Sequence, residues 1–168
     1  MISKSKGFTL LELMIVIILL SILALLLIGN YMSSLTKGRD SQRKNDLNQI
    51  QRALEMYYED TNHYPVLIDS QLFGKKFCDT SPDVNSCSKI YMVRTPKDPN
   101  SGYTYHYVTD GTASPQTYYV YSAIENLQDQ SQGVSIKGYT GIDSSCGTNI
   151  LCRYYVSSPN ANPPAQNP

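Results

Sequence analysis

An almost uninterrupted apolar segment near the N-terminus constrains this chain most strongly. Residues 8–28 form a run of 21 in which only Thr9, Glu12 and Ser21 are polar or charged. As a helix, the run would be about 31 Å long, close to the thickness of the hydrocarbon core of a bilayer. A buried helix of a globular domain is seldom this long and apolar on every face. We therefore expect residues 8–28 to cross a membrane as a helix.

Glu12 is the one ionisable side chain within this apolar segment. An unpaired carboxylate in the apolar zone of a membrane is costly, so such a residue is functional by default and needs a partner. In a plainer interpretation, Glu12 lies near the start of the helix and its side chain reaches the lipid headgroups. The residues that precede Glu12 favour the functional role.

A short, polar and basic leader precedes the apolar segment and ends in glycine. Residues 1–7 end at Gly7, and the chain continues Phe-Thr-Leu-Leu-Glu from Phe8 to Glu12. This pattern resembles the class III signal of type IV prepilins and of type II secretion pseudopilins. The resemblance implies a prepilin peptidase that removes residues 1–7 by cutting between Gly7 and Phe8, and that methylates the new amino terminus.

The same resemblance supplies a partner for Glu12. In these families, the glutamate at the fifth position of the mature chain pairs with the amino-terminal charge of a neighbouring subunit, which here is the amine of Phe8. Two opposite charges that leave water together cost far less than one charge alone. The resemblance therefore implies a homo-oligomeric helical filament, with Phe8 and Glu12 as its assembly residues.

The helix is expected to continue beyond the apolar segment to about Thr61. Residues 29–64 carry one apolar stripe at three- and four-residue steps, which indicates the amphipathic half of the same helix. Gly29 stands where the family often has a helix-breaking proline, and glycine costs a helix about 1 kcal/mol relative to alanine. We expect Ser21 to Gly29 to be a hinge that loosens when subunits assemble. The stripe contains Leu47, Ile50, Ala53, Leu54 and Tyr57.

Basic residues at positions 37, 39, 43 and 44 follow the apolar segment. Taken alone, the positive-inside rule would place the following domain in the cytoplasm, but the rule is less decisive for long translocated domains. The leader and the cysteines favour export. Asp40 lies four residues before Lys44, which predicts a helical ion pair. The basic group itself has three interpretations: a contact to anionic headgroups, a contact to acidic surfaces of neighbouring subunits, or a solvated helix face.

Residues 65–156 are expected to form a globular head. Tyr103, Tyr105 and Tyr107 alternate with other residues that favour strands, and residues 117–124 form the return strand of a hairpin. A third strand is expected over residues 150–157. The fold class is therefore α+β, with a long N-terminal helix packed on a small antiparallel sheet, as in pilins.

Two parts of the chain outside this sheet are predicted to lack regular structure. Residues 65–100 are expected to be a loop-rich connection. Residues 157–168 are rich in proline, asparagine and alanine with no apolar period, and we expect a disordered tail.

Four cysteines, Cys78, Cys87, Cys146 and Cys152, follow the apolar segment. An even number in an exported domain indicates two disulfides, and pairing of sequence neighbours is the simplest of about three connectivities. Free thiols and a metal site are the alternatives. The metal site is disfavoured because the spacings are longer than CxxC and the two histidines have no motif relation to the cysteines.

The sequence contains no G-x-S-x-G elbow, P-loop, H-E-x-x-H motif or dinucleotide-binding fingerprint, and we expect no enzyme. Basic and acidic side chains number 14 each, so nothing indicates a nucleic-acid surface. The resemblance to major pseudopilins implies a calcium site in the loop after the second sheet strand, where Glu125 and Asp129 are the candidate ligands. The compact Gly-Asp-Gly pattern is missing, and calcium needs about six to eight oxygens. We therefore expect no resident cofactor, with calcium as the less favoured alternative.

These features together predict a structural subunit of a type IV pilus-like filament. Its partners would be copies of itself, a prepilin peptidase and an assembly platform in the membrane. Before assembly it would be a single-pass inner-membrane protein with its head outside, and afterwards part of an extracellular filament. The first alternative is the major pseudopilin of a type II secretion system, which the Tyr-Pro and Pro-Lys-Asp-Pro motifs favour. The second is a membrane-anchored binding module that does not polymerise.

Overall fold

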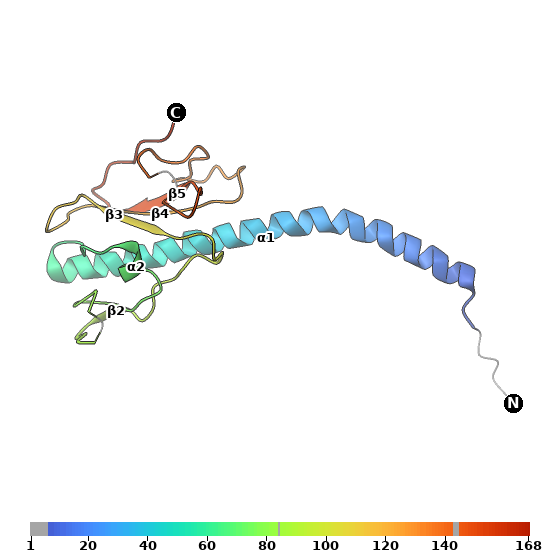
Figure 1. Cartoon of the computed structure of the whole chain (residues 1–168), viewed down its shortest axis with the longest axis horizontal. Coiled ribbons are helices and arrows are strands. Elements are labelled where there is room, and N and C mark those ends of the chain that lie inside the picture. The colour runs from blue at the N-terminus through green and yellow to red at the C-terminus, as the bar shows by residue number, and fades with distance from the viewer. Residues whose placement is uncertain (1–6, 84, 143–144) are drawn as a thin grey trace.

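The computed structural model describes residues 7–83, 85–142 and 145–168, with side chains for all of them except residues 26–30. A long helix carries a small head around its C-terminal half, so the predicted α+β architecture is confirmed (Figure 1). The elements are α1 (Leu10–Thr61), α2 (Asp69–Leu72), β1 (Phe77–Cys78), β2 (Ile90–Met92), β3 (His106–Thr109), β4 (Tyr118–Ser122) and β5 (Tyr154–Ser157).

Local capping sets both ends of α1. At the start, Thr9 is extended and its Oγ1 accepts the backbone N–H of Glu12 at 3.2 Å, which satisfies one of the free donors of the first turn. At the end, Asn62 takes a left-handed conformation with φ 58° and donates its N–H to the carbonyl of Tyr58. The predicted end of the helix near Thr61 is therefore confirmed.

The core of the head lies between α1 and a three-stranded antiparallel sheet of order β3-β4-β5. The predicted apolar stripe of α1 is buried, from Leu47 to Tyr57. Opposite it, the sheet places Tyr107, Val120 and Val156 in register across the three strands. The hairpin and the third strand were predicted correctly, although each strand is shorter than expected.

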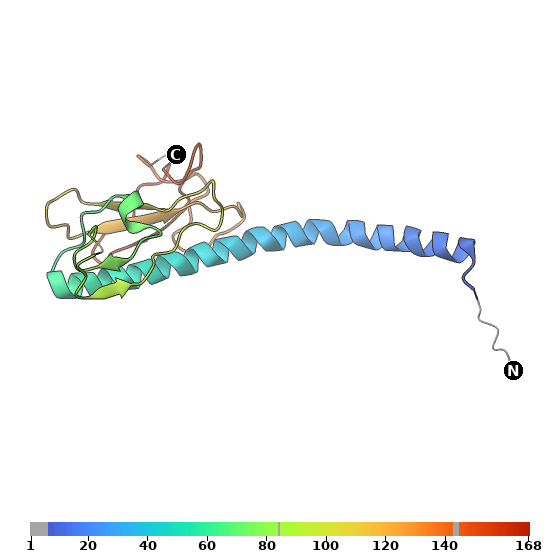
Figure 2. The ribbon, with the colours of Figure 1, turned by 60° about the horizontal axis from the view of Figure 1, so that its bottom comes forward.

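A second, smaller sheet packs on the other side of α1. Strands β1 and β2 form an antiparallel hairpin that lies on the opposite side of the helix from β3-β4-β5 in Figure 1 and in front of the helix in Figure 2. Phe77 of β1 and Tyr91 of β2 contact the ring of Tyr57, with centroids 5.5 and 5.4 Å away. The prediction of a loop-rich connection over residues 65–100 missed this hairpin and α2. Strands of two and three residues are too short to show an alternating pattern.

The C-terminal tail is ordered, so the prediction of disorder for residues 157–168 was wrong. The tail returns over the loop that covers the outer face of the main sheet. Thr140 donates its backbone N–H to the carbonyl of Ala165 at 2.9 Å, and Asn167 donates to Gly138 at 3.1 Å. The hydroxyl of Tyr119 donates to the carbonyl of Asn162. These hydrogen bonds fix a segment whose composition gave no sign of a packed face.

Candidate assembly site and charged junction

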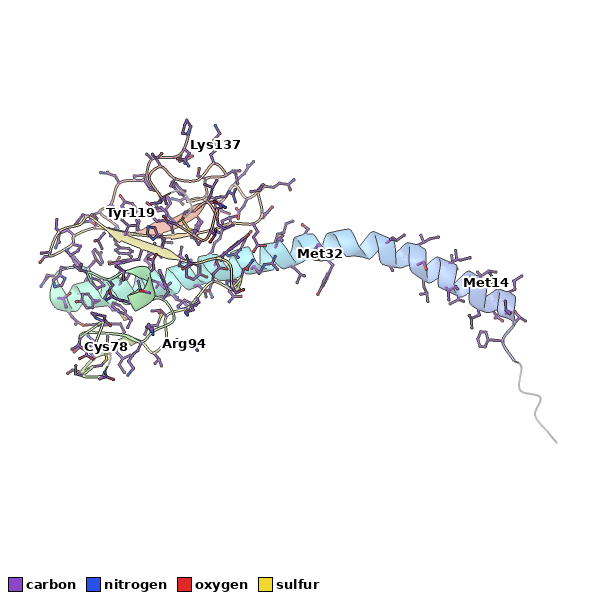
Figure 3. All side chains as sticks on the ribbon, viewed as in Figure 1. Met14, Met32, Cys78, Arg94, Tyr119 and Lys137 are labelled. Carbon is purple, nitrogen blue, oxygen red and sulfur yellow. A yellow bond between two sulfur atoms is a disulfide. The ribbon has the colours of Figure 1, made fainter. Side chains whose placement is uncertain are left out.

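The N-terminal half of α1 is exposed around its whole circumference. Its large apolar side chains from Phe8 to Leu25 show between 46% and 82% of their surface. Exposed apolar side chains continue at Tyr31, Met32 and Leu35, just before the head begins. Figure 3 shows the side chains around Met14 and Met32 extending from the helix, with no other described segment against them. An apolar surface of this size on one chain marks a site of membrane or protein contact.

No helix in the described part of the chain combines the length and the hydropathy of a membrane span. The predicted span of residues 8–28 includes positions 26–28, whose side chains lie outside that part. The span therefore stays a prediction.

The predicted cleavage site lies just before α1. Gly7 and Phe8 precede the first helical residue and are exposed. Residues 1–6 of the predicted leader lie outside the described residues. A peptidase needs an accessible bond outside a helix, and the Gly7–Phe8 bond is exposed and precedes α1.

Glu12 is the third residue of α1 and has an exposed carboxylate without an ion-pair partner among the described residues. Its first-turn position is favourable because the helix dipole attracts negative charge there. The Thr9-Leu-Leu-Glu12 stretch also matches the capping-box pattern. Glu12 thus also helps to start the helix, a role that the Thr-x-x-Glu pattern of the sequence indicates.

Both residues of the predicted hinge fall within α1. Ser21 donates its hydroxyl to the carbonyl of Ile17 at 2.7 Å, a bond made within the helix. Gly29 lies in the stretch without described side chains. Loosening of this segment during assembly stays a prediction.

Where α1 enters the head, its charged residues meet acidic residues that are distant in the sequence. We call this cluster the charged junction. It contains Arg39, Asp40, Arg43 and Lys44 of α1, Asp98 between β2 and β3, and Glu125 and Asp129 in the loop after β4.

Arg43 is the centre of the charged junction, and its side chain is fully buried. Its guanidinium donates twice to Asp98, at 2.8 and 2.9 Å, and once to Asp40 at 2.7 Å. Glu125 lies 2.7 Å from the same guanidinium, which also stands over the ring of Tyr103. Burial lowers the pKa of Arg43, but the hydrogen bonds to these carboxylates outweigh burial and raise its pKa above the ordinary value. Arg43 therefore remains charged inside the protein.

The loop after β4 is tied to α1 by two further ion pairs. Arg39 makes two hydrogen bonds to Glu125, at 2.9 and 2.5 Å, and Lys44 makes one to Asp129 at 2.5 Å. The hydrogen bond from Arg39 lowers the pKa of Glu125. Burial raises the pKa of Asp129, but its bonds to Lys44 and neighbouring groups lower it overall to about 2.

The charged junction corrects two predictions about α1. Asp40 pairs with Arg43, three residues on, while Lys44 pairs with Asp129 instead of Asp40. Arg39, Arg43 and Lys44 make ion pairs within the chain, so the interpretation as a merely solvated helix face is wrong for them. The contacts to headgroups or to neighbouring subunits stay predictions. Tertiary partners 85 or more residues away outcompete the local helical pair. Lys37 alone of this group is exposed.

The structure pairs the four cysteines as sequence neighbours. Cys78 bonds Cys87 with 5.8 Å between their Cα atoms, and closes the β1-β2 hairpin. Cys146 bonds Cys152 with a Cα separation of 5.2 Å, and closes part of the loop over the main sheet. Cys78, Asp79 and Cys87 are close enough to one another to suggest a metal site, but both of the sulfurs are used in the disulfide.

Comparisons with known proteins match almost the whole of α1 and most of the head. Residues 2–28 match the family model of the prokaryotic N-terminal methylation motif, and residues 30–137 match that of type II secretion system (T2SS), protein G. The chain belongs to the type II secretion system protein G family. Members of this family are structural pseudopilins, so the chain is not an enzyme. No solved structure matches the chain.

Several curated relatives are called type II secretion system core protein G. The protein of Pectobacterium carotovorum is 37% identical over 101 residues, which cover 57% of this chain and 62% of that protein. The protein of Vibrio cholerae is 34% identical over 109 residues, covering 64% and 73%. The protein of Pseudomonas aeruginosa is 32% identical over 117 residues, covering 69% and 82%. These matches favour the secretion pseudopilin, our first alternative, over the surface pilus that we expected.

Proposed function

We propose that the chain is the major structural subunit of a type II secretion pseudopilus. The observation that carries this proposal is the exposed apolar half of α1, which has no covering segment in the described chain. Removing apolar surface from water is worth about 25 cal/mol per Å². A helix of this kind is stable only in lipid or against other apolar helices, and a filament supplies the second environment.

The proposal gives the apolar half of α1 two successive environments. It first anchors the chain in the inner membrane, with the head outside the cytoplasm. It then packs against the same half of neighbouring copies when an assembly platform extracts the subunit into a periplasmic filament. The two disulfides support an oxidising compartment for the head.

Processing supplies the group that Glu12 lacks in the single chain. Cleavage after Gly7 would leave a positive amine on Phe8, four residues before Glu12. The match to the methylation motif supports this cleavage and the methylation of the new terminus. In the filament, the amine of one subunit would neutralise the carboxylate of the next, and neither charge would be buried alone.

Mass spectrometry of the amino terminus, combined with cell fractionation, tests this function. We expect a chain that begins at N-methylated Phe8 in the inner membrane, and no long filaments in material sheared from the cell surface. Side-chain cross-links between apolar halves of α1 should appear only when the secretion system is present.

Two results would contradict the proposal in different ways. Abundant long surface filaments at normal expression would indicate that the chain is the subunit of a type IV pilus. A chain that still begins at Met1 in cells with active peptidase would instead indicate an anchored module that does not polymerise.

A further inference from the structure

The family resemblance implies calcium in the loop after β4, but the residues of this chain do not fit such a site. Both oxygens of Glu125 accept hydrogen bonds from Arg39, and one oxygen also contacts Arg43. Asp129 is bound through one oxygen to Lys44 and through the other to Ser131. Calcium takes about six to eight oxygens, and here the oxygens of Glu125 and one oxygen of Asp129 already face positive groups, while the other oxygen of Asp129 is bound to Ser131.

The geometry around Arg43 shows what holds the loop instead. Carboxylates from three separate segments converge on one guanidinium: Asp40 from α1, Asp98 from the segment before β3, and Glu125 from the loop after β4. Asp40 also accepts the backbone N–H groups of Glu125 and Asn126, at 3.0 and 2.8 Å. A buried cation that gathers carboxylates from several segments does structurally what a bound metal ion does.

We propose that Arg43 takes the place of a divalent cation in this head, so that the loop after β4 is held on α1 without calcium. The charge balance supports this role. Three basic side chains of the charged junction face four carboxylates, which leaves a single formal negative charge. Adding a divalent ion would give the cluster a net positive charge and bring the ion against guanidinium groups. The proposal concerns the folding of one chain and does not depend on filament formation.

Removing the guanidinium should convert the cluster into a cation site. In an Arg43→Ala variant, the carboxylates of Asp40, Asp98 and Glu125 would still converge from their three segments. Asp40 and Asp98 would lose their cation, and Glu125 would keep only Arg39. Carboxylates that lie close together with too little positive charge among them repel, and a divalent ion that binds the two freed carboxylates relieves that repulsion. Ligands that bind only the folded state raise its stability.

Thermal unfolding of the full-length chain in detergent micelles tests this proposal, measured with excess EDTA and with millimolar calcium. The near-ultraviolet circular dichroism of tyrosine is a suitable signal because, of the 14 tyrosines, only Tyr31 precedes Tyr57, so the signal reports on the head. For the wild type we expect the same Tm in both conditions. For Arg43→Ala in EDTA we expect a Tm lower by about 10 °C or more, because its carboxylate partners lose a buried counter-ion. Calcium should recover a large part of that loss.

Arg52→Ala is the matched control, since Arg52 is exposed on the same helix and outside the charged junction. It should keep the wild-type Tm with and without calcium. If Arg43→Ala does not fold in either condition, Arg43→Gln, which keeps part of the side chain and an amide donor, is measured with the same two expectations.

Three results would overturn the proposal. The first is a wild-type Tm that rises with calcium or falls with EDTA. The second is an Arg43 variant as stable in EDTA as the Arg52 control. The third is a folded, destabilised Arg43 variant whose Tm does not respond to calcium.

Discussion

The two halves of α1 belong to one continuous helix but differ in where their partners lie. In the N-terminal half, every large apolar side chain from Phe8 to Leu25 is at least 46% exposed. In the C-terminal half, the stripe from Leu47 to Tyr57 is at most 7% exposed. Both halves are α-helical, so the difference in exposure comes from what packs against each half.

This difference separates folding from assembly within one element. The C-terminal half is covered by two sheets and makes the ion pairs of the charged junction, and all of these partners belong to the same chain. The N-terminal half gains nothing from the rest of the chain and keeps its full apolar surface available for lipid or for other copies. Substitutions in the C-terminal half should therefore change the stability of the head, and substitutions in the N-terminal half should change assembly.

The largest effect is expected for Glu12→Gln in the exposed half. Glutamine keeps the capping-box chemistry at the third helical position but removes the charge that would pair with the Phe8 amine. The subunit should remain in the membrane while the yield of filaments falls about tenfold or more, because one amine per subunit would be buried without a partner. Filament yield after overexpression of the secretion system measures this effect.

Glu59→Gln is the control for that experiment, since Glu59 is an exposed carboxylate at the far end of the same helix. It should assemble normally. Normal filament yield from the Glu12 variant would show that the intersubunit pair is not needed.

A second prediction compares the same substitution in the two halves. Leu54→Ala removes a fully buried side chain and should lower the free energy of unfolding of the head by about 3 kcal/mol. Leu19 is 55% exposed, so Leu19→Ala should change the stability of the head by less than about 0.5 kcal/mol. Thermal unfolding followed by tyrosine circular dichroism measures both. Equal losses would mean that the apolar half folds against the head after all.

The sequence allowed the prediction of those parts of the fold that have a clear local pattern. The run of residues 8–28 is apolar without a period, and the stripe from Leu47 to Tyr57 has the helical period. The strand around Tyr107 lies in a stretch where tyrosine recurs at every second residue, as in a half-buried strand. Each of these patterns lies within one short stretch of sequence and reflects the environment of that stretch, so the sequence alone was enough to identify it.

What the sequence did not show depends on pairs of residues far apart in the chain. Arg43 and Asp98 are 55 residues apart, and nothing near either residue indicates that they meet in the core. Lys44 had a local candidate partner in Asp40, and the tertiary fold replaced it with Asp129. The ordered tail was missed for the same reason, because backbone hydrogen bonds to distant segments leave no pattern in side-chain type. The β1-β2 hairpin was missed because its strands are too short to show an alternating pattern.

The smallest predicted effect is the pH dependence of the charged junction. The pKa values of Glu125 and Asp129 are lower in the folded head than in an unfolded chain, and that of Asp129 is about 2. A carboxyl group with a lowered pKa stabilises the fold above its unfolded pKa, and this contribution is lost as the pH falls. For Asp129 the loss should occur between about pH 4 and about pH 2, and amount to about 2 kcal/mol at most.

One buried carboxyl group, that of Asp46, has the opposite effect on the pH dependence of stability. Burial raises the pKa of Asp46, so its protonation in acid removes a cost of folding and partly offsets the loss from the charged junction. Denaturant unfolding at a series of pH values should therefore show a shallow fall in stability towards acid. Asp129→Asn should be less stable at neutral pH and should flatten that fall, because the group that titrates is gone. A variant with the wild-type slope would mean that the pair between Lys44 and Asp129 contributes nothing to the stability of the head, and that Arg39 and Arg43 hold the loop alone.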